Sequence, residues 1–427
     1  MRKKERADCV KKHVWILNHY AGGMYVDKGG RHYNFAKYLK QAGYEPAVFC
    51  AVSKHGKPEP YFEMGGLWEE RTAEAIGVPW VFVRARTYTG NGKQRVLNML
   101  DFYRNVKKAA KEYAEKHGKP DIIYASSVHP LTLLAGIQLA KRFGVKCVCE
   151  VRDLWPESLV AYGLLKRGSL AAAALYAGEK WLYKKADAVI MTWPGGYDYI
   201  RERGWERQIP AGKVVHISNG VDLTVFAENR ESRQIADADL DDRNKFHAVY
   251  AGSVRKVNDL RLLVDAAEIL ARRGNDRVRV LVWGDGDQRE ALESLAREKG
   301  LENIRFKGRV EKNAIPYILS RADVTILHNR RSKLDKYGQS QNKFFEYLAA
   351  GKPILMTYSV GYSVCRARNC GIELEEQTPE AVADALEQLS GLSEDDYQTY
   401  AKNAAAAAEE YDFRNLTQKL IGALEAL

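Results

Sequence analysis

The segment FHAVYAGSVRKVNDLRLLVDAAEILARRGNDRVRVLVWG, residues 246–284, decides the fold. Short apolar runs rich in β-branched residues stand at 246–253 and 278–284, and residues 260–274 between them repeat apolar positions at helical spacing. A strand, a helix and a second strand in this order form a unit whose strands lie parallel. The segment therefore predicts a parallel sheet covered by helices.

The same alternation continues along the chain in both directions. Toward the carboxyl end, strands are predicted at 303–308, 322–328 and 353–358, with helices at 287–299, 312–320 and 341–350 between them. Toward the amino end, the predicted strands are 13–18, 44–51, 80–85, 120–126, 145–151, 186–192 and 213–218, and the helices are 31–43, 94–117 and 169–185. The predicted fold class is α/β, with two doubly wound parallel sheets.

Residues 219–244 divide the two series of elements, because they are polar, acidic and without clear periodicity. A chain of 427 residues is also longer than one ordinary hydrophobic core supports. We therefore predict a first domain over 1–218 and a second over 219–411. The amphipathic segment 412–427 is predicted to form a last helix that packs back on the first domain.

Composition excludes several classes of protein. The chain is 46% hydrophobic and 28% charged, as in globular proteins. No apolar run approaches the roughly 20 residues that cross a bilayer, and the apolar stretch near the amino end is too short for a signal peptide. The six cysteines, Cys9, Cys50, Cys147, Cys149, Cys365 and Cys370, are scattered, which favours reduced, buried thiols and a cytoplasmic protein.

Positive charge is concentrated in one half of the chain. Residues 1–190 contain 32 Lys and Arg against 18 Asp and Glu, a net of +14, whereas residues 191–427 contain 34 against 37, a net of −3. Such a field attracts phosphates, anionic membrane surfaces or nucleic acid, or is simply a solvated surface. Because no recognition helix, finger or stacked-aromatic motif is present, a nucleic-acid-binding protein is the weakest of these readings.

The strongest candidate site lies in DKYGQSQNKFFEYLAAGKPIL, residues 335–355. A glycine-containing loop here opens a helix, whose free N–H groups and positive dipole end form a ready site for a diphosphate. Lys343 stands in the first turn, where a cation is unfavourable unless an anion is bound. Glu346, about one turn later, could accept hydrogen bonds from ribose hydroxyls. The alternative is that Glu346 only pairs with a neighbouring base.

This segment resembles the donor-binding region of the family-4 retaining glycosyltransferases of GT-B fold, which have two facing Rossmann-like domains. The segments YAGSVRKVNDLRLLVDAAEIL, VLVWGDGDQREALESLAREKGLENIRFKGRV, ADVTILH and HISNGVDLTVF resemble that family in the correct order. The likeness covers nearly the whole chain and is most specific over 246–356. A subgroup that acts in bacterial surface-polysaccharide assembly is the most similar.

The resemblance implies roles for particular residues. Glu346 matches the glutamate that holds the donor ribose, but Gly338 stands where its usual acidic partner would be, so backbone N–H groups of 338–341 are expected to hold sugar and phosphate. Arg255 and Lys256 resemble the basic pair that clamps the diphosphate. Further donor contacts are expected from Gly338, Ser340, Gln341, Asn342 and Lys343, and from backbone around Trp283, Gly284, Arg309 and Val310.

The amino-terminal half offers a second group of candidates. Gly29 and Gly30 precede a helix after the first strand, where the family places a glycine-rich loop facing donor phosphate and acceptor. His129 follows a strand and stands before Pro130 at a helix start, where family members place a histidine near the reacting sugar. Glu150, Arg152 and Asp153 end another strand and are the expected acceptor-side contacts, with an internal Arg152–Asp153 pair as the alternative.

The expected reaction is transfer, with retention, of a hexose or amino sugar from a nucleotide-diphosphate sugar, with UDP as the expected nucleotide. The acceptor would be a glycan or a lipid-diphosphate-linked sugar, with peripheral contact to an anionic inner membrane. Departure of the diphosphate is the difficult step, so preorganised cations and N–H groups should stabilise it. No cofactor, obligatory metal or nucleic-acid partner is expected. A nucleotide-sugar 2-epimerase of the same fold is the alternative.

Overall fold

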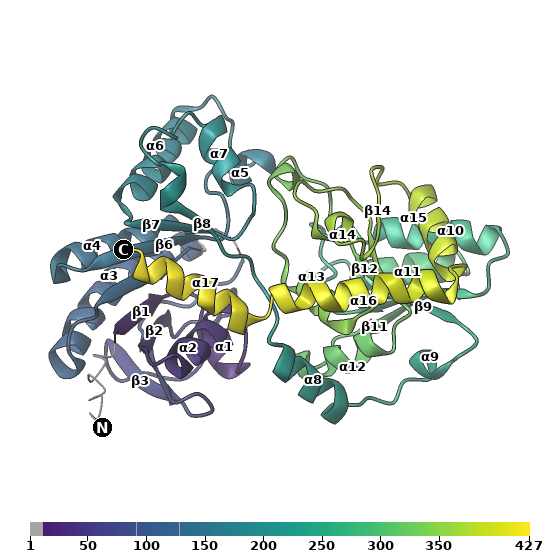
Figure 1. Cartoon of the computed structure of the whole chain (residues 1–427), viewed down its shortest axis with the longest axis horizontal. Helices are drawn as coiled ribbons and strands as arrows, with labels where there is room; N and C mark the ends of the chain where they lie inside the picture. Colours follow the sequence, from purple (N-terminus) through teal and green to yellow (C-terminus); the bar gives the residue numbers. More distant parts are fainter. Residues whose placement is uncertain (1–11, 91, 128) are drawn as a thin grey trace, which may run out of the picture. The chain divides into compact units, whose positions relative to one another are not determined.

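The computed structural model describes residues 12–90, 92–127 and 129–427. The chain divides into two compact units (Figure 1). The first comprises Met1–Ser218 and Leu416–Leu427, and the second comprises Asn219–Asn415. The last helix, α17 (Phe413–Glu425), therefore belongs mainly to the first unit, where the Tyr44 hydroxyl donates to Glu425 Oε1 over 3.0 Å. Each unit is described below by itself.

The first unit is built on a mainly parallel sheet. Its described strands run in the spatial order β3-β4-β2-β1-β5-β6-β7-β8. Their bounds are β1 His13–Leu17, β2 Glu45–Ala51, β3 Trp68–Ala73, β4 Val78–Val83, β5 Ile122–Ser126, β6 Lys146–Val151, β7 Ala188–Met191 and β8 Val214–His216. The accompanying helices are α1 Gly22–Val26, α2 Arg31–Gln41, α3 Lys93–His117, α4 Pro130–Phe143, α5 Glu157–Ala161, α6 Leu170–Lys185 and α7 Gly196–Glu202, with a short 3₁₀ turn at Ala211–Lys213.

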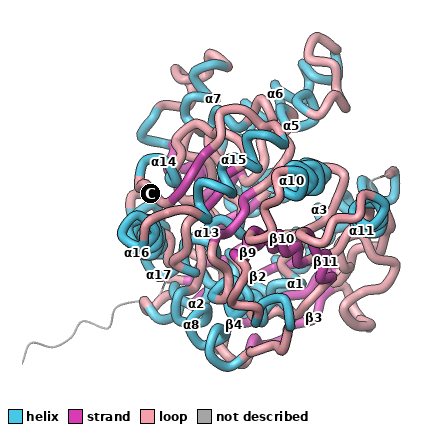
Figure 2. Tube along the Cα trace, turned by 90° about the vertical axis from the view of Figure 1, so that its right-hand side faces the viewer, coloured by secondary structure: helices cyan, strands magenta, loops and turns pink. Residues whose placement is uncertain are grey.

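The second unit has a parallel sheet in the order β11-β10-β9-β12-β13-β14. The strands are β9 Phe246–Ala251, β10 Val278–Trp283, β11 Ile304–Gly308, β12 Val324–Leu327, β13 Ile354–Met356 and β14 Gly371–Glu373. The helices are α8 Leu223–Ser232, α9 Ala238–Asp241, α10 Arg261–Arg272, α11 Arg289–Glu298, α12 Ile315–Ser320, α13 Asn342–Ala350, α14 Val364–Ala367, α15 Pro379–Ser390 and α16 Glu394–Glu410, with 3₁₀ turns at Lys312–Ala314 and Asp335–Tyr337. Figure 2 shows helices on either side of these strands.

Strand β9 shows why this sheet has two buried faces. Ala248 and Tyr250 join the core formed with α10 and α15, whereas Val249 and Ala251 join the core formed with α12, α13 and α16. Side chains along a strand point alternately to opposite faces, so a continuous apolar run fills both layers. The three-layer α/β architecture predicted from the repeated strand–helix pattern is confirmed.

Several elements differ from the sequence prediction. Strand β3 pairs antiparallel with β4, and its sequence WEERTA is too polar to resemble the buried strands. The region 219–244, predicted as an irregular connection, contains α8 and α9. The Asp222 side chain accepts a hydrogen bond from Val225 N at the start of α8. This N-cap residue was a signal for the helix in the sequence, although its apolar periodicity is weak. The short edge strand β14 was also missed.

The cysteines behave as buried apolar side chains. Cys50, Cys147, Cys149, Cys365 and Cys370 are all buried and free. The sulfurs of Cys147 and Cys149 lie 4.0 Å apart on one face of β6, as the alternation of the strand predicts. Cys9 lies outside the described residues.

Glu179 on α6 is a buried carboxyl group that forms no ion pair with any of the described residues. The hydroxyls of Tyr183 and Tyr199 each donate to it over 2.7 Å. Burial raises the pKa of Glu179 to about 8 despite these hydrogen bonds. The group is therefore mostly protonated in the folded protein at neutral pH.

We expect Glu179→Gln to abolish part of the pH dependence of stability. The pKa is higher in the folded than in the unfolded chain, so the free energy of unfolding of the wild type should fall as pH rises from about 4.5 to about 8 and then level off. The variant should match the wild type near pH 4.5 and exceed it at pH 9, by about 5 kcal/mol at most. Urea unfolding at several pH values measures this difference, and parallel curves would contradict it.

Candidate functional site

The two histidines His19 and His129 meet at the switch point of the first sheet. Strand β1 lies between β2 and β5, so the strand order reverses between β1 and β5, and open α/β sheets bind ligands at the carboxyl ends of such a pair of strands. His19 follows β1, and His129 caps α4 with Pro130 at the first helical position. Both side chains are buried. The helix start predicted at Pro130 is confirmed.

His19 Nδ1 lies 2.6 Å from His129 Nε2, within hydrogen-bonding distance. The His19 ring is also stacked on Phe102, with the ring centroids 4.4 Å apart. Burial, with a smaller contribution from Arg95, lowers the pKa of His129 to about 3, and burial followed by His129 lowers that of His19. Both imidazoles are thus neutral at pH 7. Among the described residues, His129 Nδ1 has no hydrogen-bond partner, so it can donate to or accept from a bound molecule, according to its tautomer.

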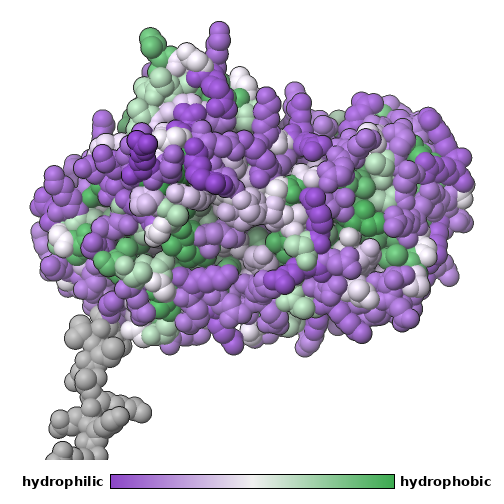
Figure 3. Space-filling model, turned by 45° about the horizontal axis from the view of Figure 1, so that its top comes forward, coloured by the Kyte–Doolittle hydropathy of each residue, from purple (hydrophilic) through white to green (hydrophobic). Residues whose placement is uncertain are grey.

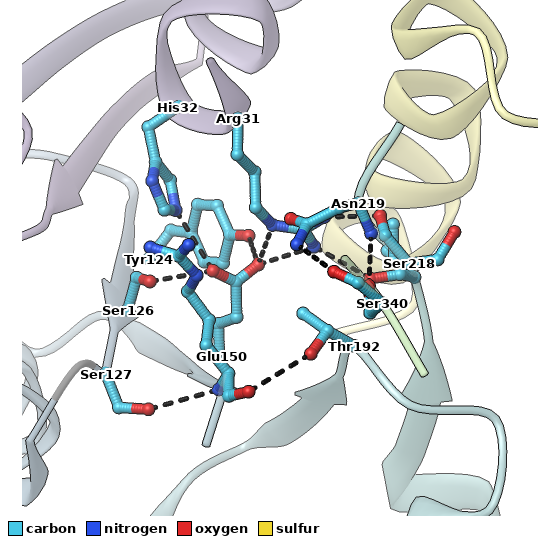
Figure 4. Close-up of polar contacts among 12 residues, drawn as sticks. Arg31, His32, Tyr124, Ser126, Ser127, Glu150, Thr192, Ser218, Asn219 and Ser340 are labelled. Atoms are coloured by element: carbon cyan, nitrogen blue, oxygen red, sulfur yellow. Dashed lines mark hydrogen bonds and ion pairs between the residues drawn. The ribbon is translucent and has the colours of Figure 1, made fainter. Parts of the chain in front are cut away.

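Glu150 is the centre of a buried ion cluster at the end of β6 (Figure 4). Arg31 Nε and Ser126 Oγ donate to it over 2.6 and 2.7 Å, His32 Nε2 lies 3.0 Å from it, and the Tyr124 hydroxyl also donates. Burial alone would raise the pKa of Glu150, but Arg31 and His32 lower it well below its usual range. The carboxyl group is therefore ionised and fully surrounded.

Arg31 connects this cluster to the residues that follow β8. Its guanidinium donates to the backbone carbonyl oxygens of Ile217, over 2.8 Å, and of Ser218. Arg31 is the first residue of α2, and Gly30 before it has a φ of 92°, which favours glycine. The predicted glycine pair Gly29-Gly30 therefore precedes a helix whose first side chain, Arg31, binds a buried carboxylate and two backbone carbonyl oxygens.

The prediction that Glu150 contacts an acceptor is corrected by this geometry. Its side chain has no exposed surface, and both carboxylate oxygens are already occupied. Arg152 is half-buried and Asp153 is exposed, and no ion pair joins them in the part of the chain that the structure describes. These two residues remain predicted acceptor contacts, whereas Glu150 fixes Arg31.

Lys343 occupies the switch point of the second sheet. Strand β9 lies between β10 and β12, so the strand order reverses between β9 and β12, whose carboxyl ends are the expected ligand-binding position. Lys343 Nζ donates to the backbone oxygen of His328, after β12, over 2.9 Å, and to the hydroxyl of Tyr250, on β9, over 3.2 Å. It stands in the first turn of α13, as predicted. Because surrounding protein atoms desolvate it, its pKa is lowered to about 7.

Glu346 lies one turn after Lys343 and on the same side of α13. It is partly accessible but closely surrounded, and this desolvation raises the pKa of its carboxyl group despite Lys312. Among the described residues no hydrogen bond or ion pair engages its side chain. The alternative in which Glu346 serves only as the partner of a neighbouring base stays open, because Lys312 favours the ionised carboxylate although it forms no ion pair with it.

The loop 338–341 before α13 is held in place by neighbouring side chains. Ser340 Oγ accepts from Asn219 N over 2.8 Å, and the Ser340 carbonyl accepts from Asn219 Nδ2 over 2.6 Å. Gln341 Nε2 donates to the Tyr358 hydroxyl over 2.6 Å. Gly338 has a φ of 91°, and the exposed Asn342 begins the helix. The loop therefore presents a fixed backbone.

Arg255 and Lys256 are exposed in the loop after β9. This loop packs directly on the loop after β10, because a Cβ atom on Gly284 would lie 1.7 Å from Gly252 O and one on Gly286 would lie 2.3 Å from Val254 O. Gly284 N also donates to Gly308 O over 2.8 Å. The predicted segments around 255, 284 and 309 are thus brought to one edge of the sheet.

The remaining predicted donor residues differ in accessibility. Arg309 is exposed and Val310 is half-buried, whereas the Trp283 side chain is 3% exposed and belongs to the core. Trp283 can therefore contribute only through its backbone, which is the role that the resemblance implied.

Several residues at these two switch points were not predicted. They are His19, Arg31, His32 and Tyr124 in the first unit, and Tyr250, Asn258 and His328 in the second. His328 follows β12 directly and His19 is the second residue after β1, and this position was a signal that could have been used. The contacts of Tyr124 and Tyr250 could not be found in this way, because they lie inside strands.

Comparison with protein families gives two matches in chain order. A model described as "Glycosyl transferase 4-like domain" matches residues 30–220, and one described as "Glycosyl transferases group 1" matches residues 245–391. The chain belongs to this family of glycosyltransferases. The resemblance inferred from the segments at 246–356 is confirmed, and the glycosyltransferase activity follows from it.

Individual relatives have low sequence identity but similar extent. A protein of Escherichia coli K12 named as a colanic acid biosynthesis glycosyl transferase, WcaI, is 23% identical over 75% of this chain and 77% of its own length. The glycosyltransferase WbjE of Pseudomonas aeruginosa is 22% identical over 64% of this chain and 66% of its own. The crystal structure of Anabaena HepE with UDP covers 97% of this chain and 100% of its own, with a TM-score of 0.66 and 15% identity. The predicted GT-B fold class is confirmed.

Proposed function

We propose that this glycosyltransferase moves a hexose or amino sugar, with retention, from a UDP-sugar to a lipid-linked or polysaccharide acceptor. The donor binds to the second unit and the acceptor to the first. The observation that carries the donor assignment is Lys343, a desolvated cation at a helix start. That position disfavours a cation unless an anion is bound. The complexes of the fold relative HepE with UDP and with UDP-glucose support the choice of nucleotide.

The proposed chemistry centres on the departing diphosphate. Lys343, the free N–H groups at the start of α13, and the exposed Arg255 and Lys256 supply positive potential to stabilise its developing charge. Glu346 accepts hydrogen bonds from the ribose. The diphosphate oxygen itself takes the acceptor proton, so this route needs no enzymic base, and neutral His129 contributes a hydrogen bond to the reacting sugar.

We propose that the reaction needs no obligatory metal. Among the residues that the structure describes, no group of three or more His, Cys, Asp or Glu side chains is arranged to hold a metal ion. The cationic side chains of the protein would supply the charge stabilisation that a metal provides elsewhere. Full turnover in the presence of EDTA is the expected result.

The acceptor side of the proposal rests on relatives and on charge. WcaI is named for colanic acid biosynthesis and TuaH of Bacillus subtilis for teichuronic acid biosynthesis, which are both polymers of sugars. No helix among the described residues is long and apolar enough to cross a membrane. We propose that the basic first half of the chain makes peripheral contact with an anionic membrane to reach a lipid-linked acceptor.

Calorimetric titration with UDP, GDP and their sugars tests the proposed donor. We expect binding of UDP and a UDP-sugar, and weaker binding in Glu346→Ala and in the Arg255→Ala/Lys256→Ala double variant. NMR of the product should show that the anomeric configuration is retained. Conversion of the donor alone into an epimeric nucleotide sugar would instead identify a 2-epimerase, and preference for GDP would overturn the choice of nucleotide.

A further inference from the structure

A cavity with almost wholly apolar walls lies in the first unit beside His129. Its volume is about 210 Å³, and it is lined by parts of α4, α6 and the loop after β6. His129 and Asp153 contribute to its wall, together with apolar side chains that include Leu134, Trp155, Leu175 and Trp181. A sugar needs polar partners in its site, so the walls fit hydrocarbon better.

The one carboxyl group on α6, that of Glu179, adds little polarity to the cavity wall. Glu179 also borders the cavity, but it is buried and bound by two tyrosine hydroxyls. It is mostly protonated at pH 7, as described above, and so adds little charge to the wall. Glu179 therefore places no unpaired ion against a buried hydrocarbon chain.

The surface of α6 outside the cavity is unusually apolar. Leu170 is 91% exposed and Leu164, in the preceding loop, is 76% exposed. Leu175 and Trp181 are both partly exposed on the surface and part of the cavity wall, so the apolar surface continues into the cavity. Figure 3 shows hydrophobic residues, in green, on the projection that carries α6. Exposed apolar side chains that continue into an apolar cavity are typical of a binding groove.

The charges on this segment have one sign. Between residues 162 and 185, Glu179 is the only acidic residue and it is buried. The basic residues of the same stretch are Lys166, Arg167, Lys180, Lys184 and Lys185. Apolar side chains interspersed with cations, without exposed acids, are the composition of helices that lie in the surface of an anionic bilayer. The segment is thus complementary to anionic lipid.

We propose that the cavity beneath α6 binds the hydrocarbon chain of a lipid with a phosphate-containing headgroup, which enters from an anionic bilayer along α6 and presents its headgroup toward His129. This inference rests on the proposed function, because it assigns a site to the apolar part of a lipid-linked acceptor. The hydrocarbon chain binds because burial removes its apolar surface from water. This contribution to affinity is independent of the sugar that the headgroup carries.

Farnesyl diphosphate and inorganic diphosphate are the probes that test the cavity. In calorimetry with the full-length protein, we expect farnesyl diphosphate to bind at least tenfold more tightly than inorganic diphosphate. Gly178→Leu should abolish this difference, because residue 178 lines the cavity and an added Cβ atom meets nothing within 4 Å. Gly168→Leu is the matched control, since position 168 is equally open but does not line the cavity, and it should bind both probes like the wild type.

Two outcomes would overturn the proposal: equal affinity for the two probes in the wild type, or an unchanged preference in Gly178→Leu. Titration of UDP into the same samples separates this failure from that of the proposed function. If the wild type binds UDP but shows no preference for farnesyl diphosphate, only the lipid site is contradicted. If the wild type does not bind UDP, the donor assignment is contradicted.

A second experiment uses vesicles of phosphatidylcholine with phosphatidylglycerol. Leu170→Glu should reduce co-sedimentation of the protein with these vesicles at least threefold. Unchanged co-sedimentation would contradict the entry route along α6.

Discussion

Lys343→Met should lower kcat/KM for the nucleotide sugar by about 100- to 1000-fold, since loss of a preorganised group that stabilises developing negative charge costs roughly 3–4 kcal/mol. The Lys343 ammonium is held between the Tyr250 hydroxyl and the His328 carbonyl at the opening of α13. Methionine keeps the length of the side chain and removes the charge. Steady-state kinetics with a saturating acceptor measures the effect.

The stability of the donor-free variant is the control for this experiment. Burial disfavours the charged form of Lys343, so its removal should leave the free energy of unfolding unchanged or slightly higher. Low activity in a protein that unfolds at the wild-type urea concentration would therefore report on the diphosphate rather than on folding. Activity within threefold of the wild type would contradict the assignment.

Donor affinity should also depend on pH through this lysine. With a pKa of about 7 in the free protein, Lys343 is charged below pH 7 and largely neutral at pH 9. A bound diphosphate favours the charged form, so binding above pH 7 must take up a proton, and affinity should fall by up to about tenfold per pH unit. Calorimetry in buffers of different ionisation enthalpy measures the proton uptake, which Lys343→Met should lack.

Glu150→Gln should destabilise the first unit by about 3–5 kcal/mol, because removing one partner of a buried ion pair leaves the other charge uncompensated. Arg31 would remain buried against the carbonyl oxygens of Ile217 and Ser218 without its carboxylate. A loss of this size corresponds to a fall in Tm of about 10 °C for a unit of this length. Differential scanning calorimetry measures it.

The exposed pair Lys54–Glu59 provides a matched control. Its Nζ–Oε1 distance is 3.6 Å and both side chains are at least one-third exposed, so Glu59→Gln should cost less than about 1 kcal/mol. A Glu150→Gln/Arg31→Met double variant should recover part of the lost stability, because it removes the unpaired cation. Equal effects of Glu150→Gln and Glu59→Gln would show that the buried cluster does not hold this part of the unit.

The sequence predicted most strands because parallel strands buried on both faces read as continuous apolar runs. Strands β9 and β10 are clear cases. It failed for β3, where the polar residues of an antiparallel edge strand lack that signal, and for α8, whose apolar positions have little periodicity. Edge elements bury less surface, so their sequences are less constrained.

By itself, the sequence determined the two α/β series, the family, and the expectation that Lys343 and Glu346 share a helix near a phosphate site. Those features depend on local periodicity and on motifs within a few residues. Only the tertiary structure decided that Glu150 is an internal counterion rather than an acceptor contact, and that His19 pairs with His129. Glu150 and Arg31 are 119 residues apart, and His19 and His129 are 110 apart. Such contacts follow from the order in which strands are laid side by side, which brings distant strand ends to one edge of a sheet.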